Sequence, residues 1–253
     1  MSENLVIKFE NNDKEQVSWI VVDSAGMMCS APARGTLKEA AADIGGRRVI
    51  VLVPSVDVLT TSVDIPAKGQ KLMAALPYAL EEYLAQEVEE LHFATGGKRS
   101  TGHTPVSVVS QDRMDAWLST LATDAVTADA IIPDNHGLAR IPGTTSVFLT
   151  GDHLFINDGG DVELVMENVG PLDALTAMGA ANPVAEGADD EDSTINSMPR
   201  HLLVYCAAET EQKYEADWIA LREELDSVDV KILPDGIMPK LAATVATGAG
   251  INL

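Results

Sequence analysis

The chain has 253 residues, with 39 Asp and Glu against 17 Lys and Arg, which gives a formal net charge of -22. Binding to nucleic acid and docking on an anionic bilayer both depend on clustered Lys and Arg, so this balance argues against both. It favours a partner with a basic surface, although the charge can also serve solubility alone.

Cys29 and Cys206 are the only cysteines and lie far apart in the sequence. They form neither a CxxC pair nor a disulfide framework, so we expect a reducing compartment and cysteines that pack as small apolar residues. The first residues lack a basic region followed by an apolar core, and no apolar run reaches the roughly 18–20 residues of a membrane helix. The 253-residue chain is therefore expected to be soluble and cytoplasmic.

In the first half, apolar runs and turn residues predict strands at Leu5 to Phe9, Ser18 to Asp23, Met27 to Ala31, Arg48 to Val53, Leu59 to Ile65, Val106 to Ser110 and Ala130 to Ile132. The Arg48 to Val53 run is continuously apolar, which is typical of a strand buried on both faces. Helices are expected at Thr36 to Ile44, with Thr36 as the cap, and at Asp112 to Ala122.

A longer helix is predicted between these elements. Apolar residues recur every four positions, at Leu72, Leu76, Leu80, Leu84 and Val88, with Leu91 beside them. This spacing places one apolar stripe on a helix. Pro77 falls inside the pattern and either kinks the helix or starts its second part.

The second half repeats the order of elements. Strands are expected at Ser146 to Thr150, Leu154 to Asn157, Glu163 to Glu167, Leu202 to Cys206 and Val228 to Leu233. Helices are expected at Pro171 to Met178, Trp218 to Leu225 and Leu241 to Ala246, and Ala185 to Ser197 is predicted to be a mobile acidic loop.

Each half thus has three strands followed by alternating helices and strands. This order predicts an α/β actin-like fold, a duplicated ribonuclease-H-type fold with mixed sheets flanked by helices. The first lobe is expected at residues 1–143 and the second at residues 144–253. Another mixed α/β architecture is the alternative.

The stretch from Pro77 to Phe93 combines a proline-tyrosine start, the paired acids Glu81 and Glu82, and a terminal histidine-phenylalanine. It resembles the conserved segment of the type II secretion system protein L family. Val49 to Pro66 resembles the strands and turn that precede this segment in the family. The resemblance is dense over residues 49–94 and sparse elsewhere.

Two shorter matches lie outside this region. Ile132 to Asp134 is similar to a proline-aspartate step of the family, and Asn252-Leu253 to the start of a segment that leads towards a membrane helix. The resemblance implies an actin-like fold in a protein that crosses the inner membrane once, with this part on the cytoplasmic face. It implies binding to the secretion ATPase, protein E (GspE), and to protein M (GspM) and other platform components. It leaves open whether the chain also forms a homodimer. It implies no catalytic residues, because the family is not regarded as catalytic.

An actin-like ATPase needs glycine-rich turns whose backbone N–H groups hold phosphates. Phe9 to Asp13 has no glycine and carries acids, while Leu149 to Asp152 has one glycine. Asp158 to Asp161 is better explained as a hairpin turn that needs positive φ. We therefore expect no bound nucleotide, and no cofactor. A nucleotide-dependent actin-like ATPase or filament former is the alternative from another class, and a pilus-assembly relative is a third.

The sequence contains no recognisable motif for metal binding or for hydrolytic catalysis. The five histidines are His92, His103, His136, His153 and His201. None lies in HExxH or four residues from another ligand, and neither cysteine has a catalytic signature. Adjacent acids point about 100° apart on a helix, so pairs such as Asp189-Asp190 form no converging dyad.

One side of the long helix predicted above is acidic. Its polar residues, which we expect to bind a partner, are Glu81, Glu82, Gln86, Glu89 and Glu90. Such a stripe can meet Arg or Lys of a partner and would act mostly on encounter rate and orientation. A solvated face is the alternative. The acidic run from Glu186 to Asp192 is predicted to be a disordered loop rather than a docking site.

Overall fold

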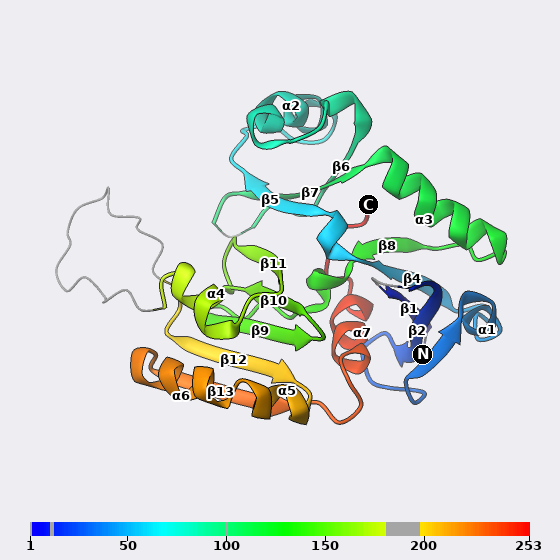
Figure 1. Cartoon of the computed structure of the whole chain (residues 1–253). Coiled ribbons are helices and arrows are strands. Elements are labelled where there is room, and N and C mark those ends of the chain that lie inside the picture. The colour runs from blue at the N-terminus through cyan, green and yellow to red at the C-terminus, as the bar shows by residue number, and fades with distance from the viewer. Residues whose placement is uncertain (1, 11–12, 100, 181–197) are drawn as a thin grey trace. The chain divides into compact units, whose positions relative to one another are not determined.

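The computed structural model describes residues 2–10, 13–99, 101–180 and 198–253, which form two compact units (Figure 1). The first unit comprises Met1–Gly137 and Met238–Leu253, and the second comprises Leu138–Ile237. The last helix therefore belongs to the first unit, whereas the sequence-based division into 1–143 and 144–253 placed it in the second lobe. The acidic run of residues 186–192, and the predicted loop of which it is part, lie outside the described residues.

The first unit contains a five-stranded mixed sheet in the order β3-β2-β1-β4-β8. Its strands are β1 (Glu3–Glu10), β2 (Asp13–Asp23), β3 (Ala33–Thr36), β4 (Arg48–Val53) and β8 (Ala130–Pro133). β1 pairs antiparallel with β2 and parallel with β4, and β4 pairs parallel with β8. Five of the six residues of β4 are buried, as expected of an apolar strand covered on both faces.

Two helices cover the core of this sheet. α1 (Leu37–Ala41) buries Leu37, and α3 (Gln111–Thr123) buries Trp117 and Leu121. α1 ends earlier than the predicted Ile44. Its start is fixed by a capping box, since the Thr36 hydroxyl accepts from the Glu39 N–H at 3.3 Å and the Glu39 carboxylate accepts from the Thr36 N–H at 2.7 Å. The Glu39 carboxylate also accepts from the Thr36 hydroxyl at 3.0 Å. The bond from the Thr36 backbone N–H, followed by this hydroxyl bond, lowers the pKa of Glu39.

A smaller antiparallel sheet, β5-β7-β6, belongs to the same unit. Its strands are β5 (Leu59–Val63), β6 (Leu91–Thr95) and β7 (Thr104–Ser110). α2 (Gln70–Leu80) packs on one face through Leu72, Leu76 and Leu80, which join Val106 and Val108 in one core cluster. This apolar stripe confirms the predicted spacing, but only over three of its five positions.

The helix predicted from Leu72 to Leu91 is wrong in its second half. α2 ends at Leu80, a 3₁₀ helix η2 (Glu81–Tyr83) and a second, η3 (Val88–Glu90), follow, and Leu91 begins β6. Leu91 pairs with Ser110 of β7, and five ladder positions follow that register. The partner strand thus competes with the helical spacing and determines the structure of this stretch.

α7 (Met238–Ala246) and the residues after it return to the first sheet. The helix buries Met238, Leu241 and Val245. Beyond it the Ile131 N–H donates to the Asn252 side-chain oxygen at 2.8 Å, and the Leu253 N–H donates to the Ile131 carbonyl at 2.9 Å. These bonds occupy the outer edge of β8.

The second unit repeats the five-stranded layout in the order β11-β10-β9-β12-β13. Its elements are β9 (Thr144–Thr150), β10 (His153–Asn157), β11 (Glu163–Glu167), α4 (Pro171–Ala177), β12 (His201–Cys206), α5 (Ala208–Lys213), α6 (Glu215–Glu224) and β13 (Ser227–Ile232). β9 pairs antiparallel with β10 and parallel with β12, as β1 does with β2 and β4. Matching strand order and direction confirm the predicted duplication.

Two local predictions are corrected. The third strand is Ala33–Thr36 rather than Met27 to Ala31, where a single bridge joins Val22 and Met28. Cys206 is 1% exposed, as expected, but Cys29 is exposed. Burial, followed by the nearby charge of Glu211, raises the pKa of Cys206 to about 11. Over the described ranges, no helix is long and apolar enough to cross a membrane.

Candidate interaction site

The acidic segment, residues 81–90, leaves α2 and leads into β6. It contains five glutamates and no Lys or Arg. All five glutamates are exposed, and none forms an ion pair within the described part of the chain. The segment therefore presents uncompensated negative charge to solvent, where a basic partner would be attracted.

The five residues predicted to bind a partner lie close in sequence but not on one helix. Glu81 and Glu82 are in η2, Gln86 lies in a bend, and Glu89 and Glu90 are in η3. The predicted single acidic helix face is therefore wrong, because α2 ends before the first of them. All five side chains are exposed, so their role in partner binding stays a prediction.

Two tyrosines accompany the acidic residues on the surface. Tyr78 of α2 is 82% exposed and Tyr83 of η2 is 77% exposed. Tyrosine is enriched in protein interfaces, since it offers a large apolar ring with a polar end and few rotatable bonds. Two uncovered tyrosines beside five carboxylates give this surface both anchoring and charged groups.

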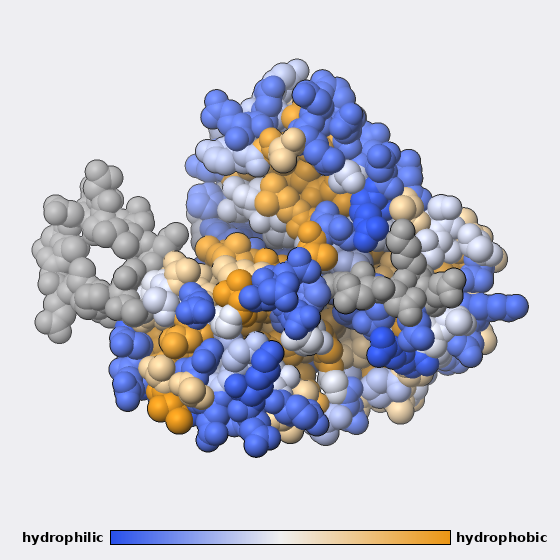
Figure 2. All heavy atoms as spheres, viewed as in Figure 1, coloured by the Kyte–Doolittle hydropathy of each residue, from blue (hydrophilic) through white to orange (hydrophobic). Residues whose placement is uncertain are grey.

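A groove runs along β5 beside these residues. Its volume is about 490 Å³, and its lining comprises Leu59, Thr61, Ser62, Val63, Asp64, Ile65, Ala79, Leu80 and Tyr83. Asp64 is the only charged residue among the described residues of the lining. Figure 2 shows an apolar area over β5, below the mostly hydrophilic surface of α2.

β5 is an edge strand, because it pairs with β7 and with no other strand of the described chain. An edge strand has backbone N–H and C=O groups that can pair with an added chain. No Lys or Pro interrupts Leu59–Val63, and Leu59 is 43% exposed. The sequence predicted a strand here but gave no signal that its edge is open, since that depends on which strands pair.

One of the candidate phosphate turns has backbone N–H groups that bond to side chains of the turn itself. Between β10 and β11, Gly159 has φ +76, which confirms the predicted positive-φ hairpin turn. The Gly159 N–H donates to the Asn157 side chain at 2.9 Å, and the Asp158 carboxylate accepts from the N–H groups of Gly160 and Val162 at 2.7 and 3.0 Å. A carboxylate already occupies the position that an anion would take.

The other two candidate turns provide less evidence on phosphate binding. Residues 11 and 12 of the first candidate turn, Phe9 to Asp13, lie outside the described residues. Gly151 lies in the β9–β10 turn with φ +58, and a tight hairpin turn by itself requires such a positive φ.

Buried polar groups gather where β1, β4 and β8 end. Asp134, 1% exposed, accepts from the backbone N–H and hydroxyl of Ser55 at 3.0 and 2.6 Å. Its second oxygen lies 3.6 Å from the Lys8 ammonium, which is also 3.7 Å from Glu10. Ligands of open α/β sheets bind outside these strand ends. Here the lysine at that edge is already paired with carboxylates.

Metal binding finds no support within the described ranges, where no group of three or more His, Cys, Asp or Glu is placed to hold an ion. His136 accepts from the Ile251 N–H at 3.2 Å, and His153 lies 2.9 Å from Glu167. Both therefore have local structural partners.

The family model of type II secretion system (T2SS) protein L matches residues 5–229. The chain belongs to the type II secretion system protein L family. Among curated members, the protein of Dickeya chrysanthemi is 29% identical over 142 residues, which cover 54% of this chain and 35% of that protein. The Vibrio cholerae member is 30% identical over 155 residues, which cover 56% of this chain and 37% of that protein. These matches thus span little more than a third of either relative.

Solved structures share the fold of this chain. The cytoplasmic domain of EpsL, an inner membrane component of the type II secretion system of Vibrio cholerae, has a TM-score of 0.65 at 20% identity, covering 99% of this chain and 97% of that one. A Bacteroides thetaiotaomicron protein described as having an actin-like ATPase fold and unknown function has a TM-score of 0.57 at 8% identity, covering 96% of each. A chain of the PilM–PilN type IV pilus biogenesis complex has a TM-score of 0.60 at 14% identity, covering 96% of this chain and 97% of that one. The predicted actin-like fold is confirmed.

Proposed function

We propose that this chain is the cytoplasmic part of a single-pass inner-membrane scaffold, which recruits the secretion ATPase, protein E, to the platform that exports proteins across the outer membrane. Its membership of the protein L family carries the proposal. The similar Vibrio cholerae domain is described as cytoplasmic and as part of an inner membrane component. Protein M and other platform components are proposed as further partners, and a homodimer as an additional contact.

The scaffold is proposed to have no catalytic activity of its own. Support comes from the Gly159–Gly160 turn, whose N–H groups are bonded to side chains of the same turn. Further support comes from the Lys8 ammonium, which is already paired with the Asp134 carboxylate. A Mg-ATP titration in a calorimeter is the check, and binding heat followed by phosphate release would support the actin-like ATPase alternative.

The ATPase contact is assigned to the acidic segment and the groove along β5. Glu81, Glu82, Gln86, Glu89 and Glu90 would meet Arg or Lys of the partner, and Tyr83 would pack on an extended stretch of it. Negative charge at the rim increases the encounter rate, whereas an aromatic anchor slows dissociation. The two halves of the surface can therefore be separated kinetically.

The experiment measures association of the purified chain with the N-terminal region of its cognate ATPase by surface plasmon resonance at two salt concentrations. The fourfold variant Glu81→Gln, Glu82→Gln, Glu89→Gln and Glu90→Gln should associate more slowly at low salt, with the difference shrinking at high salt. Tyr83→Ala should dissociate on the order of tenfold faster, as expected for an interface anchor.

A matched control makes the same charge change elsewhere, on exposed residues of the second unit: Glu223→Gln, Glu224→Gln, Asp229→Asn and Asp235→Asn. If both fourfold variants slow association equally, total charge rather than the acidic segment attracts the partner. No association of the unaltered chain at micromolar concentrations would count against the recruiting role itself.

A further inference from the structure

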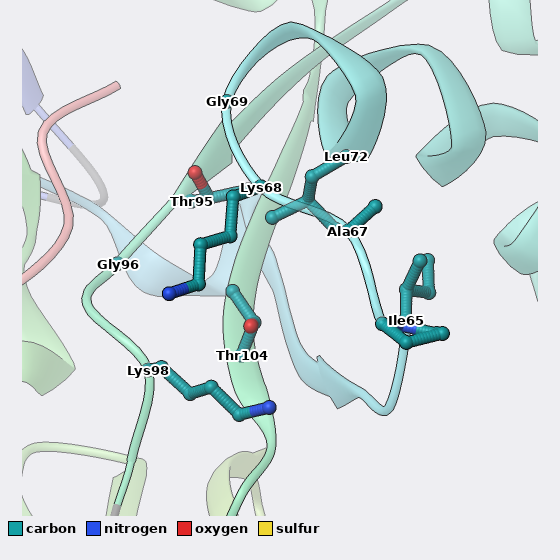
Figure 3. A pocket seen from close by; sticks show the side chains of 10 residues that line it. Ile65, Ala67, Lys68, Gly69, Leu72, Thr95, Gly96, Lys98 and Thr104 are labelled. Atoms are coloured by element: carbon teal, nitrogen blue, oxygen red, sulfur yellow. The ribbon is translucent and has the colours of Figure 1, made fainter.

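A second cavity of the first unit lies apart from the acidic segment. Its volume is about 620 Å³, and its lining comprises Ile65, Pro66, Ala67, Lys68, Gly69, Leu72, Thr95, Gly96, Lys98 and Thr104. The loop that joins β5 to α2 forms one side, and the ends of β6 and β7 form the other (Figure 3). One wall is apolar, through Ile65, Pro66 and Leu72.

The charge of this cavity is opposite to that of the chain. Among the described residues, its lining includes two lysines and no carboxylate, although acidic residues outnumber basic ones by 39 to 17 in the sequence. Within the described part of the protein, neither Lys68 nor Lys98 forms an ion pair or a side-chain hydrogen bond. Figure 3 shows the Lys68 side chain extending towards the strand that carries Gly96, while the Lys98 side chain crosses to the strand of Thr104, below its side chain. Two unpaired ammonium groups at one cavity favour an anion.

Thr104 adds a hydroxyl donor to the lining. Its residue is only 6% exposed, and it lines the cavity between the two lysines (Figure 3). Its hydroxyl forms no hydrogen bond within the ranges that the structure describes. The hydroxyl is therefore available to donate to a ligand oxygen in the cavity.

The start of α2 supplies backbone donors at the same place. Gly69, its N-cap residue, lines the cavity and has no side-chain cap, and the first turn holds no acidic residue. The first N–H groups of a helix have no intrahelical acceptor, and the positive end of the helix dipole attracts anions. α2 has 11 residues, which is long enough for this effect.

We propose that this cavity binds a phosphate ester, with Lys68, Lys98 and Thr104 around the phosphate and the apolar wall against its organic part. Donors on separate elements suit a tetrahedral group with several terminal oxygens better than the two coplanar oxygens of a carboxylate. A cavity of about 620 Å³ exceeds what a bare phosphate needs, which leaves room for an organic moiety. The phosphate can come from a soluble ester or from a phospholipid headgroup.

The test titrates the chain with inorganic phosphate and with glycerol 3-phosphate, and follows backbone amide signals by NMR. We expect the signals of Lys68, Gly69, Lys98 and Thr104 to move with glycerol 3-phosphate, and to a smaller extent with phosphate. In parallel, co-sedimentation compares vesicles of phosphatidylglycerol with vesicles of phosphatidylcholine. Binding to the first alone would identify the headgroup as the source, and binding of glycerol 3-phosphate alone would identify a soluble ester.

Two variants and a control separate the site from general charge. Lys68→Gln with Lys98→Gln, and Thr104→Val alone, should each weaken binding by about tenfold or more, since each removes donors to a charged group. Lys38→Gln with Lys231→Gln changes the net charge equally at exposed positions outside the cavity and should have no effect. Thr104→Val should also leave the thermal midpoint unchanged or higher, because the hydroxyl it removes makes no internal hydrogen bond.

The proposal is overturned if neither ligand nor vesicle binds, or if the control pair weakens binding as much as the cavity pair. It is also overturned if Thr104→Val retains full affinity while the protein stays folded. None of these outcomes depends on the ATPase, so the site can fail while the scaffold proposal stands.

Discussion

Gly26 offers a direct test of where α7 packs. Its φ is +83, and a Cβ placed on it would lie 2.5 Å from the Ala243 carbonyl oxygen of α7. Gly46 has nearly the same φ, +82, but no atom of the described residues lies within 4 Å of its added Cβ. Alanine at either glycine therefore meets the same backbone preference, and only alanine at Gly26 meets the helix.

The magnitudes follow from these two contributions. A non-glycine residue in the left-handed region costs about 1–2 kcal/mol, which applies to both substitutions. Crowding against a packed neighbour costs a further ~1–3 kcal/mol at Gly26 alone, because the atom approached is backbone. The entropy that alanine removes from the unfolded chain is the same for both and cancels in the comparison.

Gly26→Ala should thus destabilise the first unit by about 1–3 kcal/mol more than Gly46→Ala. Urea unfolding followed by tryptophan fluorescence measures this. Trp19 and Trp117 report the first unit, and a Trp218→Phe background removes the signal of the second. Equal losses for both variants, within about 0.5 kcal/mol, would refute the packing of α7 against the β2–β3 turn.

Three further outcomes are expected. Native protein at pH 8 should react with a thiol reagent once, at exposed Cys29, because the pKa of Cys206, about 11, keeps that thiol protonated; Cys29→Ser should abolish the fast reaction, and a second fast equivalent would contradict the burial. NMR titration should place the pKa of Glu39 below its ordinary 4.5, so the stabilising hydrogen bonds to its carboxylate are present above that pH and lost as pH falls. Thr36→Ala should retain part of the lowering of this pKa, because the backbone hydrogen bond remains. The same variant should lose about 1 kcal/mol of stability through the lost cap. Asp134→Ala should cost about 1–3 kcal/mol in a urea titration, since it leaves the buried Ser55 N–H and hydroxyl without their acceptor and the Lys8 ammonium with Glu10 alone. A loss below about 1 kcal/mol would show that these groups are not buried as described.

The sheets of both units could be predicted from the sequence because their signals are local. Runs such as Arg48 to Val53 are apolar throughout, and turn residues such as Asp158-Gly159 separate the strands. The order of elements then predicted the duplication that the matching sheets show. Element order survives small errors in boundaries, such as the late start of β3.

What could not be predicted depends on distant partners. The four-residue spacing of Leu72 to Val88 fits a helix, and only pairing with β7 makes Leu91–Thr95 a strand. That change moved the predicted acidic residues from one helix face to two 3₁₀ turns and a bend. The open edge of β5, the position of α7 and the cavity between Lys68 and Lys98 likewise result from packing between segments remote in sequence.

The bonds that hold residues 251–253 along β8 have a mechanical consequence. Ile251, Asn252 and Leu253 attach to His136 and Ile131 at three points, and the Ile251 side chain is 5% exposed. Tension applied at Leu253 would enter the first unit through β8, the outer strand of its five-stranded sheet. Whatever moves that end of the chain would therefore pull on the same unit that carries the acidic segment.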